Sequence, residues 1–384
     1  MKRPLFNVGA VFTAPIFTAP IFKTTTILGA LVFATSACAQ PNAPEQASAS
    51  STQTIHSSQN TQSTQSTQST QKTATGNVSS AINKRLRQIL SQAGIKTEIT
   101  DIVPSNFPNM YQVNLVGQPP LHLTADGKYV IQGELQANPS KRVVTKTPVR
   151  SSSAQVGQPV SAAVKSALLA NMGALKNMTA KTPFFYTAIP GVIWGATLEG
   201  VPFLISDDAQ YVTDGEISVI ENGQFTGLDI DFEARKNQSV FAELDESQLI
   251  TYPATSSERA VIYVATDVNC PFCRKLHQQI DSLNKKGVTV KTIGYPIYEA
   301  SPEQMRGIWC QADASSRRTA LDNAMLKAQM TPAPANCTAD DVIPNREKAA
   351  GLAVIATPAI YRDDGVLFQA SFESPEFLEF LGVQ

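Results

Sequence analysis

Cys270 and Cys273, two cysteines with two residues between them, are the side chains in this sequence best suited to chemistry. The apolar, β-branched run 260–264 before them predicts a buried strand. The apolar residues after them recur at the spacing of a helix: Leu276, Ile280 and Leu283. The cysteine pair is therefore expected at a turn from a strand into a helix.

The predicted helix start makes Cys270 a candidate nucleophile. Residues that favour the beginning of a helix lie around it, namely Asp267 or Asn269 as the cap and Pro271 in the first turn. Unpaired backbone N–H groups at that end, with Arg274 and Lys275 nearby, are expected to stabilise a thiolate and to lower the pKa of Cys270. Cys273 lies one turn further on and can close a disulfide with it, so the pattern predicts a redox centre.

Other uses of a cysteine pair fit this sequence less well. A zinc site needs further ligands at close spacing, but Cys310 and Cys337 are isolated and the chain holds only 3 His. Covalent haem attachment needs His directly after the second cysteine, where Arg274 stands. A structural disulfide across two residues closes a small loop and stabilises little. We therefore predict no metal site and no cofactor.

Residues 1–39 predict a signal peptide. Lys2 and Arg3 supply positive charge, an apolar run follows, and Ala37-Cys-Ala39 fits the small-residue rule for cleavage. Cleavage there would remove one of the 5 cysteines. A second interpretation makes Cys38 the lipidated first residue of a lipoprotein. Both interpretations predict an exported protein, in a compartment that permits disulfides.

The length and composition of the chain bound the number of its domains. Its 384 residues, with a net charge of −1 and 42% hydrophobic content, are typical of two or three soluble domains and do not favour nucleic-acid binding. Residues 40–77 are rich in Ser, Thr, Gln and Asn and contain tandem Ser-Thr-Gln triplets. Such a segment cannot bury a core, so we expect a disordered linker there.

Two segments share one plan, in which an amphipathic helix precedes a group of strands. The first is residues 78–140, with a helix that ends at Gly94 and strand candidates at 111–116, 121–123 and 129–135. The second is residues 160–231, with a helix at 160–172 and strand candidates at 192–198, 202–205 and 211–220. Seven residues recur 82 positions later, from Pro108 and Pro190 to Glu134 and Glu216. This indicates an internal duplication, with residues 141–159 as the link.

Four motifs, in this order, resemble the DsbC and DsbG disulfide isomerases of the thioredoxin superfamily: Thr266-Asp267, Cys270-Pro-Phe-Cys273, Ile308-Trp-Cys310 and Ala356-Thr-Pro358-Ala. The resemblance is clearest over residues 250–384. The run 121–133 is also similar to the small N-terminal dimerisation domain of DsbC.

The resemblance implies an α+β protein. Two tandem cystatin-like domains of the DsbC N-terminal type, at 78–140 and 160–231, would precede a linker helix at 232–256 and a thioredoxin-like catalytic domain at 257–384. The family carries one such N-terminal domain, so the second copy is a departure from it.

The region 302–351 is expected to be largely helical and to form an insertion in the thioredoxin-like domain. Cys310 and Cys337 lie within it, and a structural disulfide between them would stabilise the domain by about 3 to 4 kcal/mol. A second reactive pair is the alternative. His277 shares a helix face with Cys273, and it is either a proton relay or an ordinary surface or half-buried histidine.

Thr357 and Pro358 receive their role only from the resemblance. In the superfamily the proline at this position is cis and packs beside the redox-active disulfide. The residue before it then offers backbone groups that bind an extended substrate chain in the manner of an added strand.

The predicted function is that of a periplasmic thiol:disulfide interchange protein, which isomerises or reduces incorrect disulfides in secreted proteins. The resemblance implies a membrane thiol reductase of the DsbD type as the electron donor. Two alternatives stay open: a holdase-type chaperone with secondary redox activity, and a net dithiol oxidase like DsbA.

The duplicated N-terminal domain leaves two assemblies open. The copies can pair within one chain and leave a monomer, or one copy can pair with its twin in a second chain. We expect a homodimer in which the first copy, residues 78–140, keeps the edge for self-pairing.

Overall fold

The computed structural model describes residues 78–143, 155–175, 177–214, 216–337 and 345–383. The predicted signal peptide at 1–39, the linker at 40–77 and most of the link at 141–159 lie outside these residues. Within the described ranges, no helix has both the length and the apolar character needed to cross a membrane. The same ranges contain no group of three or more His, Cys, Asp or Glu side chains arranged to hold a metal ion.

The first segment forms a small module of one helix on an antiparallel sheet. Helix α1 (Ser80–Gln92) begins where the Ser79 side chain accepts a hydrogen bond from the Ile82 N–H, and Leu86 and Leu90 are buried on its apolar face. The helix ends as predicted before Gly94, which has a φ of +87°. The strands are β1 (Ile99–Pro104), β2 (Met110–Leu115), β3 (Gln118–Thr124) and β4 (Tyr129–Gln132), each paired with the next. Strand β1 has no counterpart among the predicted strands.

The second segment repeats this plan. Helix α2 (Ala162–Ala170) is capped by the Ser161 side chain, which accepts from the Val164 N–H. The strands are β6 (Phe184–Tyr186), β7 (Val192–Ala196), β8 (Pro202–Ser206) and β9 (Tyr211–Thr213), again in antiparallel sequence. We call the two units the first module and the second module.

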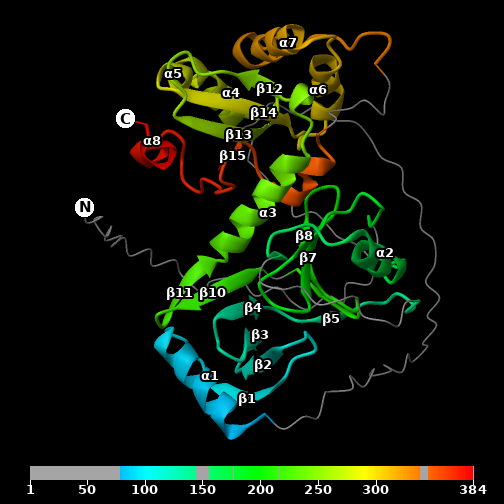
Figure 1. The fold of residues 1–384 in the computed structure, drawn as a ribbon, viewed down its shortest axis with the longest axis vertical. Coiled ribbons are helices and arrows are strands. Elements are labelled where there is room, and N and C mark those ends of the chain that lie inside the picture. Colours follow the sequence, from blue (N-terminus) through cyan, green and yellow to red (C-terminus); the bar gives the residue numbers. More distant parts are fainter. Residues whose placement is uncertain (1–77, 144–154, 176, 215, 338–344, 384) are drawn as a thin grey trace, which may run out of the picture. The chain divides into compact units, whose positions relative to one another are not determined.

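Two predicted strands, 129–135 and 211–220, are each broken in the structure. Strand β5 (Gln136–Ala137) follows β4 of the first module but pairs with β9 of the second. Strand β10 (Ile217–Glu221) follows β9 but pairs with β4 of the first module (Figure 1). Strand β11 (Gln224–Leu228) then completes a hairpin with β10. Each segment was predicted as one strand, although polar residues and a glycine interrupt it, because periodicity does not reveal which sheet a strand joins.

The predicted linker helix at 232–256 is shorter than expected. Helix α3 runs over Ile230–Glu243, with Asp229 as its cap, and a 3₁₀ turn follows at Glu246–Gln248. Strand β12 (Ile250–Tyr252) then pairs with the thioredoxin-like sheet, so the last residues of the expected linker belong to that domain.

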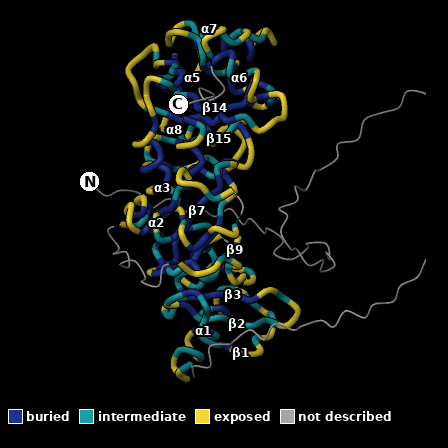
Figure 2. Tube along the Cα trace, turned by 90° about the vertical axis from the view of Figure 1, so that its right-hand side faces the viewer, coloured by how far each residue is buried: buried dark blue, intermediate teal, exposed yellow. Residues whose placement is uncertain are grey.

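The C-terminal domain has a mixed sheet in the order β12-β14-β13-β15. Strand β13 (Ala260–Thr266) lies parallel to β14 (Val288–Gly294) and antiparallel to β15 (Ala359–Arg362). The helices are α4 (Pro271–His277), α5 (Ile280–Lys285), α6 (Ser301–Trp309), α7 (Ala314–Lys327) and α8 (Pro375–Leu381). The central strands β13 and β14 are buried for most of their length, and the burial extends through β7 of the second module (Figure 2).

The helical insertion is only partly helical. Helices α6 and α7 fill its first half, but residues 328–337 are not helical, and a 3₁₀ helix at Lys348–Leu352 follows residues outside the described ranges. The expectation that 302–351 is largely helical was therefore too broad. The segment 331–336 contains Pro332 and Pro334, which supply no backbone N–H for a helix.

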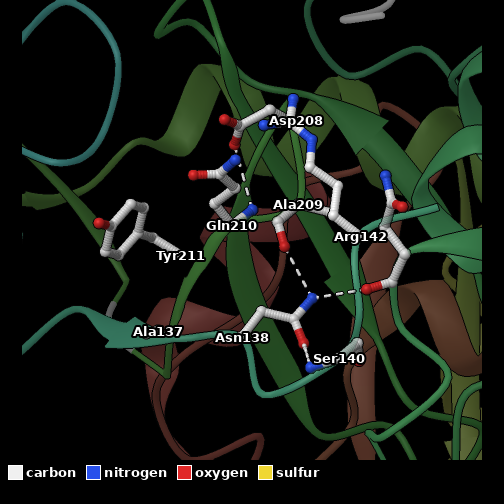
Figure 3. A pocket seen from close by; sticks show the side chains of 9 residues that line it. Ala137, Asn138, Ser140, Arg142, Asp208, Ala209, Gln210 and Tyr211 are labelled. Carbon is white, nitrogen blue, oxygen red and sulfur yellow. Dashed lines mark hydrogen bonds between the residues drawn. The ribbon is translucent and has the colours of Figure 1, made fainter. Parts of the chain in front are cut away.

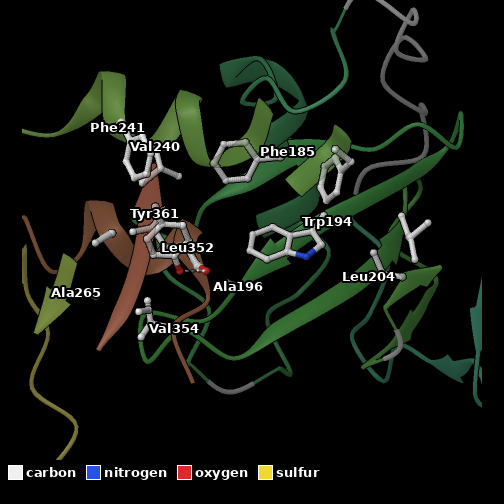
Figure 4. Close-up of a cluster of buried hydrophobic side chains, with 14 of the residues drawn as sticks. Phe185, Trp194, Ala196, Leu204, Val240, Phe241, Ala265, Leu352, Val354 and Tyr361 are labelled. Atoms are coloured by element: carbon white, nitrogen blue, oxygen red, sulfur yellow. Dashed lines mark hydrogen bonds between the residues drawn. The ribbon is translucent and has the colours of Figure 1, made fainter. Parts of the chain in front are cut away.

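Helix α3 packs against both the second module and the thioredoxin-like domain. Its buried Lys236 donates to the carbonyl of Gly351 at 3.0 Å, pairs with Glu233 at 3.0 Å and lies 4.1 Å from the centre of the Trp194 ring. The apolar side chains around it form one cluster, which draws Trp194 and Leu204 from the second module and Ala265 and Tyr361 from the C-terminal domain (Figure 4).

Candidate active site

The side chain of Cys270 is itself the cap of the active-site helix. Its sulfur accepts a hydrogen bond from the Cys273 N–H at 3.4 Å, and Pro271 occupies the first turn of α4. We expected Asp267 or Asn269 to act as the cap, and this expectation was wrong. The consequence strengthens the chemistry, because the helix end directs its free N–H groups at the reactive sulfur rather than at a neighbouring carboxylate.

Asp267 instead holds the loop that faces Cys270. Its fully buried carboxylate accepts from the backbone N–H groups of Ile297 and Tyr298, at 2.6 and 3.2 Å, and from the Ser301 hydroxyl at 2.5 Å. It also accepts from the N–H of Asn269 at 2.8 Å. Sequence reasoning missed this role, although a buried Asp directly after a core strand is itself a signal, because such a carboxylate needs several hydrogen-bond donors.

Thr357 and Pro358 lie next to the cysteine pair. The peptide bond between them is cis, and the Cys270 thiol donates to the Thr357 carbonyl at 3.0 Å across 87 residues of sequence. The pairing of β15 with β13, with Ala359 opposite Ala265, brings the two segments together. While Cys270 carries its proton, the buried Thr357 hydroxyl has no hydrogen-bond partner among the described residues, and this hydroxyl helps to lower the pKa of the Cys270 thiol.

The two thiols differ in acidity. The pKa of Cys270 is lowered to about 5, chiefly because the Cys273 thiol donates a hydrogen bond to its sulfur, while Thr357 and the N–H groups of Cys273 and Phe272 add to the effect against the cost of burial. The pKa of Cys273 is raised, first by burial and then by the adjacent Cys270. Cys270 is therefore the thiolate at neutral pH, and Cys273 keeps its proton.

Arg274 and Lys275, the two basic residues after the cysteine pair, interact with groups other than the Cys270 sulfur. Arg274 donates through Nε to the Val268 carbonyl at 3.0 Å, and Lys275 pairs with Glu373 at 3.4 Å. We expected their charge to stabilise the thiolate, but hydrogen bonds are the largest favourable contribution.

Apolar side chains near the cysteines are exposed. Phe272, between the two cysteines, is 55% exposed, and Ile355, two residues before Thr357, is 87% exposed. Ile297 and Tyr298 are each 44% exposed on the loop that Asp267 holds. These exposed apolar side chains belong to segments that adjoin the cysteine pair and the Thr357–Pro358 bond or that Asp267 holds.

His277 is part of a structural network. It is buried, and its Nε2 lies 2.8 Å from the Asp322 carboxylate, which also accepts from the Tyr252 hydroxyl at 2.8 Å. The two rings pack edge to face at 5.3 Å. This network ties α4 to α7, which is a structural role, although His277 is more deeply buried than the surface or half-buried histidine that we expected.

Cys310 and Cys337 are joined in a disulfide, with their Cα atoms 5.8 Å apart. The bond connects the end of α6 to the non-helical segment after α7, while Cys270 and Cys273 are free thiols. This arrangement corresponds to the structural role that we expected for the pair.

Two family models match the chain. The disulfide bond isomerase protein N-terminal domain matches residues 64–145, which include the whole first module, and the thioredoxin-like domain matches residues 246–376. Both matches agree with the α+β architecture expected from the sequence.

Curated relatives point in the same direction. The thiol:disulfide interchange protein DsbC of Escherichia coli (strain K12) is 29% identical over 183 residues, which cover 46% of this chain and 72% of that protein. DsbC of Dickeya dadantii (strain 3937) is 36% identical over 125 residues, or 32% of this chain and 50% of that protein. Among solved structures, Helicobacter pylori DsbG covers 73% of this chain and 99% of its own, at 14% identity and a TM-score of 0.26, which is too weak a likeness to support a conclusion.

A cysteine pair at the start of a helix, a thioredoxin-like domain and an N-terminal domain of the isomerase type thus occur in one chain. In both regions the chain is similar to the DsbC thiol:disulfide interchange proteins, and its activity is that of a thiol:disulfide oxidoreductase.

Proposed function

We propose that the protein isomerises and reduces incorrect disulfides in proteins exported to the periplasm, with Cys270 as the nucleophile and Cys273 as the resolving thiol. The observation that carries this proposal is the opposite shift of the two pKa values within one helical turn. Cys270 is the thiolate that can attack a disulfide, while Cys273 stays protonated until the mixed disulfide has formed.

The reaction begins when the Cys270 thiolate attacks one sulfur of a substrate disulfide. A bond forms between Cys270 and that sulfur, the substrate disulfide breaks, and the second substrate sulfur leaves as a thiolate. If a different substrate thiolate then attacks the mixed disulfide, Cys270 is released and the substrate has exchanged one disulfide for another. No electrons are lost or gained in this isomerisation.

Reduction is the competing outcome of the same intermediate. Cys273 loses its proton, attacks the Cys270 sulfur and releases the substrate as a dithiol, so two electrons pass to the substrate. Because burial raises the pKa of Cys273, this step is slowed and the substrate has time to rearrange. The Cys270–Cys273 disulfide must then be reduced by an external dithiol, for which we propose a membrane thiol reductase of the DsbD type.

The exposed apolar side chains support a protein substrate that is not fully folded. Phe272 follows Cys270 by two residues, and Ile355 precedes Thr357 by two. Both side chains are largely exposed to solvent. An extended chain that pairs with the backbone at Thr357 would bring its disulfide to Cys270 and cover these side chains.

Refolding of a scrambled disulfide protein tests the assignment. Cys270→Ser should abolish both isomerisation and reduction, whereas Cys273→Ser should still attack and should accumulate mixed disulfides that are visible on a non-reducing gel. Cys310→Ala/Cys337→Ala is the matched control, and it should keep its rate at temperatures at which it stays folded. Full activity in Cys270→Ser would refute the proposed nucleophile.

The alkylation rate as a function of pH tests the cause of the low pKa. The rate for Cys270 should rise with pH through a midpoint of about 5 and then level off, because only the thiolate reacts. Thr357→Val, which removes the hydroxyl but keeps the shape, should move the midpoint upward, and Thr357→Ser should restore it. An unchanged midpoint in Thr357→Val would exclude the hydroxyl as a stabiliser of the thiolate.

A further inference from the structure

The two modules correspond residue by residue at a shift of 82 positions. The helix caps Ser79 and Ser161 obey it, and so do the first residues of β2 and β7, Met110 and Val192. The shift that was found in the sequence therefore also relates the three-dimensional elements.

The exchanged strands obey the same shift in their pairing. In β10 and β4, Ser218 lies opposite Val130 and Val219 opposite Tyr129. In β5 and β9, Gln136 lies opposite Val212 and Ala137 opposite Tyr211. Adding 82 to the β5 residues and subtracting 82 from the β9 residues converts the second set of pairs into the first. Each module thus gives its last strand to the other, in the same register.

The hydrogen bonds that flank the exchanged strands follow this rule. The Asn138 N–H donates to the Gln210 carbonyl at 2.7 Å, and the Ile220 N–H donates to the Lys128 carbonyl at 2.8 Å. These bonds are again related by 82 positions in each residue, in opposite directions. An accidental contact between two modules has no reason to repeat in this reciprocal manner.

A second contact between the modules has the same symmetry. Asn109 donates through Nδ2 to the Pro190 carbonyl at 2.8 Å. The counterpart of this pair under the 82-residue shift is Gly191 with Pro108. These residues also touch, since a Cβ on Gly191 would lie 2.7 Å from the Cβ of Pro108. Both contacts belong to the turn that precedes β2 in one module and β7 in the other.

The apolar residues at the crossing also come in matched pairs. Phe107 and Ile189, Met110 and Val192, and Leu135 and Ile217 are all buried in one cluster. An interface in which the same residues of each unit meet is isologous, and it ordinarily joins two identical chains around a two-fold axis. Here both halves of the interface belong to one chain.

We propose that the duplicated modules form an intramolecular pseudo-dimer that takes the place of a second subunit, so that the protein is a monomer with one redox centre. The edges of β4 and β9 are the edges that strand exchange uses, and within the chain each is already covered by the other module's strand. The β4 edge of the first module is therefore occupied within the chain, whereas we expected the first module to keep an edge for pairing with a second chain.

Polar contacts fix the exchanged strand β5 in place. Asn138, directly after β5, donates through Nδ2 to the carbonyls of Asn171 and Ala209, at 2.8 and 2.7 Å, and accepts from the Ser140 N–H at 3.0 Å (Figure 3). These bonds attach the chain that leaves the first module to the turn and helix end of the second. They satisfy buried backbone carbonyls that would otherwise need another partner.

The same contacts between two chains would give a swapped dimer, in which the first module of one chain pairs with the second module of another. A cross-link distinguishes the two arrangements. Ala137 and Tyr211 lie opposite each other across the β5–β9 pair, which suits a disulfide. We would place Ala137→Cys/Tyr211→Cys in a Cys270→Ser/Cys273→Ser background and oxidise it.

The expected product is a cross-link within one chain, which migrates as a single chain on a non-reducing gel. Ala137→Cys alone in the same background is the matched control and should form no such product. A covalent dimer that the control does not form would overturn the proposal in favour of the swapped arrangement.

The mass in solution decides the question even if the cross-link does not form. Light scattering of the unaltered protein at tens of micromolar should give the mass of one chain, and the isomerase activity per chain should not change on dilution. The mass of two chains, or activity that falls on dilution, would overturn the proposal. Neither result depends on which cysteine is the nucleophile, so the proposal can fail while the proposed function stands.

Discussion

The two modules have the same plan but present opposite kinds of surface on the face away from their helix. In the second module, β7 and β8 place Trp194, Ala196 and Leu204 on this face, and all three are buried. The residues 82 positions earlier in the first module are Gln112, Asn114 and His122. One copy therefore carries an apolar face where the other carries a polar one.

The neighbours of each face explain the difference. Helix α3 lies on the face of the second module, where Trp194 packs against Phe232 at 6.4 Å and beneath the ammonium group of Lys236 at 4.1 Å. In the first module, Gln112 donates to Asn114 at 2.8 Å, and Asn114 donates to Asp101 at 2.6 Å. This polar chain suits a face that stays in contact with water.

Duplication thus permits a division of roles. The pairing strands β4 and β9 stay equivalent, as their shared register requires, but the outer faces are free to differ. The second module packs against α3, and α3 in turn packs against the thioredoxin-like domain. The first module contributes its strands and presents a polar face, on which Gln112 and Asn114 are half-buried.

The largest expected effect comes from exchanging the two faces at one position. Trp194→Gln, which installs the residue of the first module, should lower the free energy of unfolding by about 3 to 5 kcal/mol, because a buried ring and its contact with Lys236 are lost. Urea unfolding followed by far-ultraviolet circular dichroism measures the change.

The reciprocal variant Gln112→Trp provides the control for this comparison. It should change stability by less than about 1 kcal/mol, since Gln112 is half-buried on a polar face. Equal losses in the two variants would contradict the division of roles between the faces.

The next effect depends on pH and belongs to the first module alone. His122 is fully buried between Ser105 Oγ at 2.8 Å and the Gly133 carbonyl at 3.1 Å, and burial lowers its pKa to about 4. Between pH 6.5 and 4 the unfolded chain binds more protons at this residue than the folded chain. Stability from this group is therefore complete above pH 6.5 and falls by about 3 kcal/mol as the pH approaches 4.

His122→Leu, which installs the residue found at Leu204, removes the titrating group. The variant loses two hydrogen bonds at neutral pH, but its stability should fall less steeply than that of the parent between pH 6.5 and 4. Denaturation midpoints at several pH values provide the comparison. A parallel decline in the two proteins would show that His122 does not account for the pH dependence.

The smallest effect should be the same in both modules. Ser79 and Ser161 cap their helices at the same distance, 3.3 Å from the N–H group three residues on. Ser79→Ala and Ser161→Ala should each cost about 1 kcal/mol, and Asp at either position should retain the cap. A clear difference between the two variants would show that tertiary contacts, which differ between the modules, outweigh this local interaction.

Much of the redox domain could be predicted from local patterns. The strand at 260–264, the turn that holds Cys270 and Cys273, and the helix after it each depend on residues that are close in sequence. The shared plan of the two modules was also visible, because the corresponding residues keep a spacing of 82 positions. The role that we propose for Thr357 and Pro358 came only from the resemblance to a known family, because local pattern alone would have assigned these residues to an ordinary turn.

Other features were decided only by the tertiary structure. The donation from Cys270 to Thr357 spans 87 residues, and the cap moved to Cys270 because Asp267 is engaged by the loop at Ile297 and Tyr298. The exchange of β5 and β10 between the modules could not be predicted from the sequence either, because it depends on contacts between residues that are distant in the chain. An apolar pattern indicates which side chains of a strand must be buried. The free energy of burying them is nearly the same in either sheet, so only the tertiary structure determines with which strand it pairs.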